Sequence, residues 1–363
     1  MTRIRGKIVR PGAVITGHLE IDGPVILEVA EDTHEEADFI VPGFVDLHCH
    51  GGGGHTFTTG NAESAEQAAT FHLAHGTTTM LASLVSSPFE LMLAATSSFR
   101  PLVERGIIAG LHFEGPYLSA TRCGAQNPAF LRDPVPDELR ELAASGVARM
   151  MTIAPELPGA LDAISFLREH GIVAAIGHTD ASYEQTLAGI GRGATVGTHL
   201  CNGMRPMHHR EPGPVIGLLA TPPVVCELIA DGIHLHDGML AFAARAAGPH
   251  RTALVTDAID AAGMPDGDYE LGGQTVTVAD RVARIKTGSI AGSTLTMDTA
   301  LRRAVRAGVP LEDACLMAAT TPARVLGLAD EVGALEAGLR ADLVVLSPTL
   351  SVKRVMRAGR WVT

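Results

Sequence analysis

The sequence lacks the patterns that mark secreted, membrane-spanning or nucleic-acid-binding proteins. Its five cysteines are scattered without a C-x-x-C pair, which argues against a disulfide frame or zinc ribbon and predicts a reduced, cytoplasmic chain. No apolar run approaches the length of a membrane span, and the opening MTRIRGKIVRPG has no apolar core like that of a signal peptide. The formal net charge of −12 argues against nucleic acid or an anionic membrane as a partner.

Apolar residues, by contrast, are abundant. They make up 46% of the 363 residues, against 19% charged residues, which describes a globular chain with a large core. The length suits one large domain and one small one. In so acidic a chain, an anionic substrate would need a local basic pocket.

The middle of the chain predicts a parallel α/β fold. Apolar runs of strand length alternate there with amphipathic segments of helix length, as in consecutive βα units. Eight such units favour a (β/α)8 barrel of the TIM type. A doubly wound open sheet is the alternative that strand counting leaves open. The eight runs span residues 44–50, 77–85, 107–115, 148–156, 171–179, 193–201, 224–232 and 252–260.

Both ends of the chain predict short strands between turns. We expect residues 1–44 and 330–363 to form one small β domain that is discontinuous in sequence. The barrel domain then covers residues 45–329. It carries a turn-rich β segment at 266–288, just after the eighth run.

Residues able to bind a metal recur at or near the carboxyl ends of the predicted strands. Side chains at this end of a barrel converge on its axis, where barrel enzymes keep their active sites. A single histidine that ends a strand is weak evidence, because it is more often a structural core residue. Together, six such residues predict a metal centre. They are His48, His50, Glu114, His178, His199 and Asp257.

The stretch VDLHCHGGGGH poses a choice between a metal site and a phosphate loop. On a strand, His48 and His50 point to one face, whereas Cys49 points to the other and is expected to be a small buried residue. The glycines at 51–54 lack the G-x-x-x-x-G-K-[ST] pattern of a phosphate-binding loop. They favour a close approach of the backbone to metal and substrate.

Three of the candidates predict a metal site with an open position for water, which is the catalytic type. These are Glu114, His178 and His199. A buried salt bridge is the alternative for Glu114, although no obvious basic partner lies near it in sequence. Asp257 is predicted to be the general base and acid, with a helix N-cap as its alternative role.

Two loops at the same rim are basic, at residues 202–213 and 231–238. Arg210 and His234 are the candidates to bind an anionic group of the substrate, because a phosphate needs charge-assisted donors. The other histidines of these loops are expected to be solvated surface.

The motifs, taken in order, resemble the N-acetylglucosamine-6-phosphate deacetylase family of the amidohydrolase superfamily. The resemblance covers nearly the whole chain and implies a distorted barrel, a small β-sandwich built from both termini, and a homodimer. It implies hydrolysis of N-acetylglucosamine 6-phosphate to glucosamine 6-phosphate and acetate, in amino-sugar catabolism and cell-wall recycling. The segments that carry it are PGFVDLHCH, HFEGPYLS, CGAQNP, IGHTDA, THLCNGMRPMHHREPG, ADGIHLH, VTDAIDAAG, IAGSTLTMD and GLRADLVVL.

The resemblance also assigns metal ligands. Glu114, His178 and His199 would hold the main ion. His48 and His50 would hold a second ion together with Asp257, with Glu114 bridging; some relatives lack this pair and use one metal. The implied cofactor is therefore one or two divalent ions per subunit, zinc first, with iron, manganese, cobalt or cadmium as alternatives.

The remaining roles concern the substrate. Asn202 and the backbone at Gly203 would contact the phosphate, as would His234, and Arg210 would reach it across the dimer interface. Gln126 stands where some relatives have a histidine that polarises the acetyl carbonyl. Glutamine can donate a hydrogen bond but carries no charge, so a substrate contact is expected of it.

The implied mechanism is attack by a metal-bound hydroxide, with Asp257 moving the proton from water to the sugar amine. One alternative is a cyclic amidase or deaminase of the same superfamily, but those commonly place a carboxylated lysine between two metals. None of the three lysines (Lys7, Lys286 and Lys353) ends a predicted barrel strand. A non-catalytic scaffold relative is the other alternative, and such proteins drop ligands that this chain retains.

Overall fold

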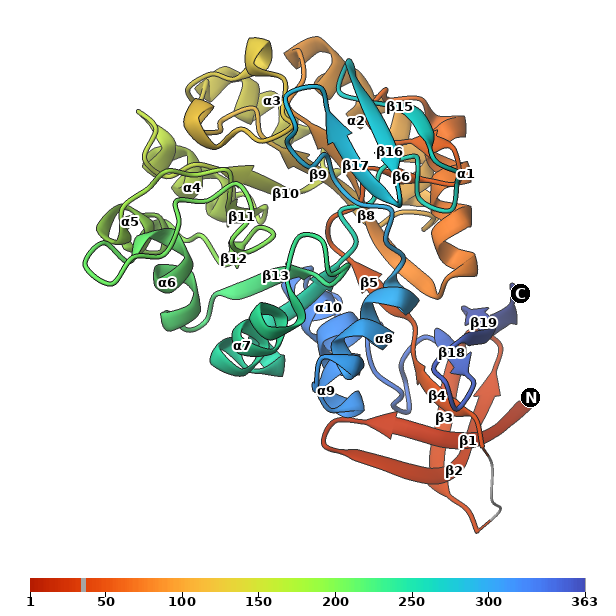
Figure 1. Cartoon of the computed structure of the whole chain (residues 1–363). Coiled ribbons are helices and arrows are strands. Elements are labelled where there is room, and N and C mark those ends of the chain that lie inside the picture. The colour runs from red at the N-terminus through yellow and green to blue at the C-terminus, as the bar shows by residue number, and fades with distance from the viewer. Residues whose placement is uncertain (34–36, 363) are drawn as a thin grey trace.

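A computed structural model describes residues 1–33 and 37–362 and contains the predicted barrel (Figure 1). Eight strands form one sheet in the order β14-β13-β12-β11-β10-β9-β8-β5, and every pair of neighbours is parallel. The neighbour order follows the chain order, which confirms a barrel and excludes a doubly wound sheet. The strands are β5 (Phe44–Asp46), β8 (Thr77–Val85), β9 (Gly110–Glu114), β10 (Ala148–Ile153), β11 (Val173–Ile176), β12 (Val196–Gly197), β13 (Val225–Ile229) and β14 (Thr252–Val255).

Helices cover the outside of these strands, so the strands are buried on both faces. All nine residues of β8 are buried, as expected for a parallel strand between a packed interior and a helix layer. The helices are α1 (Ala62–Ala74), α2 (Phe89–Glu104), α3 (Pro136–Ala144), α4 (Ala160–Glu169), α5 (Tyr183–Arg192), α6 (Gly213–Ala220), α7 (Asp237–Ala247), α8 (Met297–Arg306), α9 (Leu311–Cys315) and α10 (Thr321–Val325), with a π-helical turn at Leu316–Thr320. In the described residues, no helix is both long and apolar enough to cross a membrane.

The barrel closes irregularly, between its first and last strands. β5 ends at Asp46, and beyond it one parallel bridge, between Cys49 and Ala258, joins the chain to the segment after the eighth strand. Around this bridge the N–H of Asp257 donates to the carbonyl of His48 (2.8 Å). The regular strand is thus shorter than the predicted run 44–50, and both His48 and Asp257 lie in the irregular seam.

Strands from both termini form a separate seven-stranded sheet in the order β20-β19-β18-β4-β1-β2-β3. Figure 1 shows it to one side of the barrel, with both chain ends nearby. It has its own buried cluster, which includes Ile8, Leu19 and Leu343. The domain boundaries at 44/45 and 329/330 remain a prediction. The strands are β1 (Thr2–Arg10), β2 (Ala13–Asp22), β3 (Val25–Glu31), β4 (Phe39–Pro42), β18 (Leu343–Leu346), β19 (Val352–Arg357) and β20 (Arg360–Trp361).

The turn-rich segment after the eighth strand forms a three-stranded antiparallel sheet of β15 (Gly267–Leu271), β16 (Gln274–Ala279) and β17 (Val282–Ile285). Its buried side chains cluster with Val85, the last residue of β8. The inserted sheet therefore lies over the carboxyl end of the barrel, where the predicted metal residues are.

Candidate metal centre

Three of the predicted site residues have a backbone conformation that non-glycine residues rarely adopt. His178, His199 and Asp257 have φ angles of 44°, 27° and 50°, and each lies two residues after the end of a barrel strand. Positive φ in a non-glycine residue costs on the order of 1–3 kcal/mol and is frequent at functional sites. The chain thus turns sharply at three strand ends and points these side chains into the barrel mouth.

The first group comprises Glu114, His178 and His199. Glu114 Oε1 lies 3.0 Å from His178 Nε2 and 2.8 Å from His199 Nε2, and the two Nε2 atoms are 3.2 Å apart. All three side chains are at least nine-tenths buried. Their donor atoms converge on one point from three different strands.

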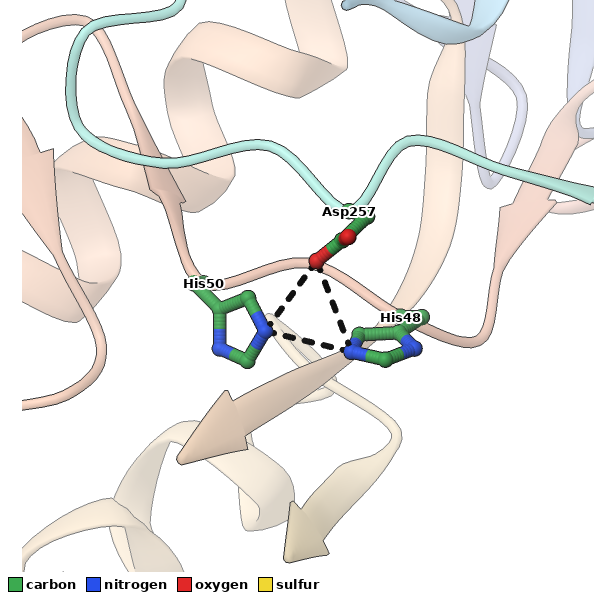
Figure 2. A group of neighbouring side chains, drawn as sticks. All are labelled: His48, His50 and Asp257. Atoms are coloured by element: carbon green, nitrogen blue, oxygen red, sulfur yellow. Dashed lines mark hydrogen bonds and ion pairs between the residues drawn. The ribbon is translucent and has the colours of Figure 1, made fainter. Parts of the chain in front are cut away.

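The second group, His48, His50 and Asp257, is shown in Figure 2. The Nε2 atoms of the two histidines are 3.1 Å apart, and Asp257 Oδ1 lies 3.2 Å from that of His50 and 3.6 Å from that of His48. Glu114 lies between the groups, because its Oε2 is 3.3 Å from His50 Nε2.

The arrangement fits divalent cations. Within each group the donor atoms lie within 4.8 Å of one another. Two imidazole nitrogens about 3 Å apart either share a hydrogen bond or, when both are unprotonated, direct their lone pairs at the space between them, where a cation can bind both. Two or three nitrogens with one or two carboxylate oxygens is the donor set of zinc and related metals.

Charges within the cluster reinforce this fit. Burial would raise the pKa of Asp257, but the neighbouring His48 and His50 lower it to about 2. Burial would lower the pKa of His50, but its bonds with Asp257 and Glu114 raise it to about 9. The pKa of Glu114 also lies well below its usual range, because His48 and His178 outweigh its burial. The carboxylates are thus anionic and need a cation, which is either a protonated imidazole or a metal ion.

Hydrogen bonds behind the ligands set their orientation. His50 Nδ1 lies 3.1 Å from the carbonyl of Ser83, and His178 Nδ1 lies 2.8 Å from that of Arg122. A carbonyl only accepts, so Nδ1 carries a hydrogen, and in the neutral ring that a metal binds, Nε2 is free to ligate. His48 has a side-chain partner instead, Glu227, at 3.2 Å.

Sequence analysis did not identify Glu227. The available signal was the one that identified Glu114, namely a lone carboxylate in an apolar strand, here within VVCELIADG. It was missed because it lies in the middle of the run and not at its end.

Cys49 lies on the other side of the seam from the ligands. It is fully buried, and its sulfur lies 3.2 Å from Nε2 of His72 in helix α1. Burial holds the pKa of the Cys49 thiol well above its usual range, so the thiol stays neutral. The glycines after it also pack closely against helix α1, since a Cβ on Gly52 would lie 2.5 Å from the ring of Phe71.

A cavity of about 230 Å³ opens onto both ligand groups. Four of the five predicted substrate residues line it, namely Gln126, Asn202, Gly203 and His234. His234 is bonded to Asp231 (2.7 Å); burial lowers its pKa, but Asp231 more than compensates and raises it. Arg210 does not line the cavity; it is exposed, and its Nη1 lies 2.9 Å from His209 of the same loop.

Gln126 lines the cavity too, but its amide is already engaged. Its Nε2 donates to Glu114 Oε2 (2.6 Å), and its Oε1 accepts from the N–H of Ser86 (2.7 Å). In this conformation it orients a predicted metal ligand. An amide nitrogen carries two hydrogens, so the predicted substrate contact can use the second N–H while the first stays on Glu114.

Comparison with known proteins agrees with this geometry. The Amidohydrolase family model matches residues 39–362. An N-acetylglucosamine-6-phosphate deacetylase of Lysinibacillus sphaericus is 36% identical over 92% of this chain and 90% of its own length. An N-acetylgalactosamine-6-phosphate deacetylase of Escherichia coli O157:H7 is 35% identical over 90% of this chain and 89% of its own.

Among solved structures, a mutant N-acetyl-D-glucosamine-6-phosphate deacetylase of Mycobacterium smegmatis, in complex with N-acetyl-D-glucosamine-6-phosphate, has a TM-score of 0.95. It is 44% identical over 98% of this chain and 97% of its own. The family model covers the barrel and the strands β4, β18, β19 and β20 of the terminal sheet. The chain therefore belongs to the amidohydrolase family, in the group that includes the N-acetylglucosamine-6-phosphate deacetylases.

Proposed function

We propose that this enzyme removes the acetyl group from N-acetylglucosamine 6-phosphate, giving glucosamine 6-phosphate and acetate. The observation that carries the proposal is the convergence of two metal-ligand groups on one cavity that also holds the His234–Asp231 pair. One end of the cavity can thus activate an amide while the other receives an anion. A cyclic amidase, a deaminase and a non-catalytic scaffold are not favoured, since the relatives that match over most of the chain are deacetylases.

The metal would be held by Glu114, His178 and His199, with room for a second ion at His48, His50 and Asp257. A bound divalent ion lowers the pKa of water toward neutrality and polarises a carbonyl oxygen. Zinc is the ion we propose first, because the donors are imidazole nitrogen and carboxylate oxygen.

Asp257 would move the proton. Its pKa of about 2 means that it is ionised before reaction and can accept a proton from the attacking water at Oδ. It would return that proton to the sugar nitrogen as the C–N bond breaks. Proton transfer of this kind contributes about 10²–10⁴-fold to the rate.

The phosphate would bind at the other end of the cavity. His234 can donate from Nε2 because Asp231 holds its Nδ1, and Asn202 and the backbone of Gly203 line the same cavity. Arg210 lies outside the cavity of its own chain, so we propose that a homodimer partner's copy supplies it. Five free cysteines support a reduced, cytoplasmic setting for the enzyme.

The direct test combines metal analysis of the purified protein with an assay of acetate release. We expect one or two divalent ions per subunit and turnover of N-acetylglucosamine 6-phosphate that chelation abolishes. N-acetylgalactosamine 6-phosphate serves as the competing substrate, because one relative is named for it. No acetate from either sugar with metal-loaded protein would overturn the proposal.

A further inference from the structure

Glu227 is a buried carboxylate to which the proposed reaction assigns no role. It lies on β13 and is fully enclosed. Its Oε2 accepts the backbone N–H of His199 (3.1 Å) and lies 3.2 Å from Nδ1 of His48. Among the described residues its Oε1 has no hydrogen-bond partner. An enclosed carboxylate is costly unless hydrogen bonds or a cation compensate it, so its environment must supply compensation.

The contact with His48 determines which ring nitrogen is available. An ionised carboxylate only accepts hydrogen bonds, so Nδ1 of His48 carries the hydrogen. In the neutral ring Nε2 then keeps its lone pair, and it faces His50 Nε2 at 3.1 Å and Asp257 Oδ1 at 3.6 Å. This is the form of histidine that ligates a metal, and a carboxylate behind the ring also makes that nitrogen a stronger donor.

Glu227 is a carboxylate, whereas the groups that orient two of the other histidine ligands are backbone carbonyls. His50 and His178 are oriented by backbone carbonyls, which are neutral. Glu227 instead adds a negative charge directly behind the second group, in a site shielded from water, where charge acts over longer distances. Its bond to His199 reaches that residue's backbone N–H and not a ring nitrogen, so its only contact with a ligand ring is the one with His48.

We propose that Glu227 is a positioning residue for the second metal ion, the one expected at His48, His50 and Asp257. This inference rests on the proposed function, since it presumes that the mouth of the barrel binds metal. It predicts different effects on the two ions, because Glu227 contacts a ligand ring of the second group and no ligand ring of the first. Loss of the Glu227 charge should weaken the second ion and leave the first in place.

The experiment is a metal titration of protein stripped with a chelator. Co²⁺ is added to wild-type protein and to Glu227→Gln, the visible absorption is followed, and metal per subunit is measured after gel filtration. We expect two binding steps in the wild type. In Glu227→Gln the first step should be unchanged, while the second should weaken about 10–100-fold, as is typical when a partner behind a ligand is lost.

Two further variants calibrate the titration. His50→Ala removes a ligand of the second group and should abolish the second step. Glu156→Gln makes the same chemical change in a carboxylate that bonds Thr179 and the backbone of Asp180, beside the first group. It should leave both steps as in the wild type.

Each outcome has one reading. Two unchanged steps in Glu227→Gln, or equal weakening of both, would overturn the inference and leave the proposed function intact. A single step in the wild type would do the same. Wild-type protein that binds no metal and releases no acetate would instead remove the proposed function itself.

A measurement on the wild type alone covers the case in which Glu227→Gln does not fold. In ¹⁵N-histidine NMR, we expect His48, assigned with His48→Asn, to carry its proton on Nδ1. Its Nε2 signal should shift only with the second equivalent of Zn²⁺. A neutral ring protonated on Nε2 and not on Nδ1, or a shift with the first equivalent alone, would contradict the role of Glu227.

Discussion

The two ends of the cavity are built to different degrees. At the metal end, Glu114, His50 and His178 are buried. Each has a hydrogen-bond partner that orients it: Gln126 for Glu114, the carbonyl of Ser83 for His50 and that of Arg122 for His178. At the end proposed to bind phosphate, His234 is held by Asp231, whereas Arg210 does not line the cavity and is exposed, bonded within its own loop.

The metal end would carry out the reaction, whereas the phosphate end would recognise the substrate. Preorganised donors in a site shielded from water act strongly and need no rearrangement, so the metal end is complete within one chain. The phosphate end has a single oriented imidazole in a protein of charge −12. One more cation is needed there to bind a phosphate dianion well, which is why the partner's Arg210 belongs to the proposal.

The largest effect is expected at the carboxylate that both ligand groups share. Glu114→Gln removes the anion that contacts His178, His199 and His50, so we expect loss of bound metal and a fall of activity to the level of chelated enzyme. Metal content and acetate release are measured together. Full metal occupancy with normal turnover would show that the metal end does not depend on Glu114.

The next effect isolates proton transfer at the same end. Asp257→Asn keeps the side chain's shape but cannot accept the proton, so we expect turnover to fall by about 10²–10⁴-fold. The first metal group should stay occupied and the melting temperature close to that of the wild type. Near-full activity in this variant would contradict the role of Asp257.

At the phosphate end the expected loss is smaller and selective. Arg210→Ala should lower kcat/KM for the 6-phosphorylated sugar by about 10–100-fold, since hydrogen bonds to charged groups contribute about 1.5–3 kcal/mol. Turnover of unphosphorylated N-acetylglucosamine should change little. The exposed Arg192 of α5, changed to Ala, is the matched control. Equal losses on both sugars would contradict the phosphate role.

A mixing experiment shows whose Arg210 is used. Arg210→Ala and Asp257→Asn subunits are each impaired, but a mixed dimer would contain one site with an intact Asp257 and the partner's intact Arg210. Activity should therefore return on mixing. No recovery, with mixed dimers shown to form, would mean that Arg210 does not act across an interface.

The positions of the strands could be predicted from the sequence because burial on both faces leaves a continuous apolar run. β8 spans the whole of the predicted run 77–85, and the other seven strands lie within their predicted runs. The convergence of Glu114 with His178 followed from the geometry of a barrel, since parallel strands end at the same rim.

The residues that form hydrogen bonds with the metal ligands could not be predicted from strand patterns. The bond between Glu227 and His48 joins residues 179 positions apart, and that between Gln126 and Glu114 depends on how a loop folds back. Periodicity reports which face of a strand is buried, but not which side chain from another strand meets it there. The irregular seam at Cys49 and Ala258 is missed for the same reason, because it depends on how the barrel closes.

The smallest effect on activity is expected at His72, which lies next to the seam. Its protonation should change the stability of the fold and not the catalysed reaction. Burial lowers the pKa of His72 to about 4, so the folded state favours the neutral ring, which bonds the carbonyl of Gly51 (2.9 Å). This stabilisation is complete above the unfolded pKa of about 6.5 and is lost as pH falls toward 4, up to about 3 kcal/mol. In urea denaturation of metal-free protein, His72→Gln should therefore lose less stability than the wild type between pH 6.5 and 4. The exposed His170, changed to Gln, should show the wild-type slope. If the His72→Gln slope also matches the wild type, His72 does not contribute to acid unfolding.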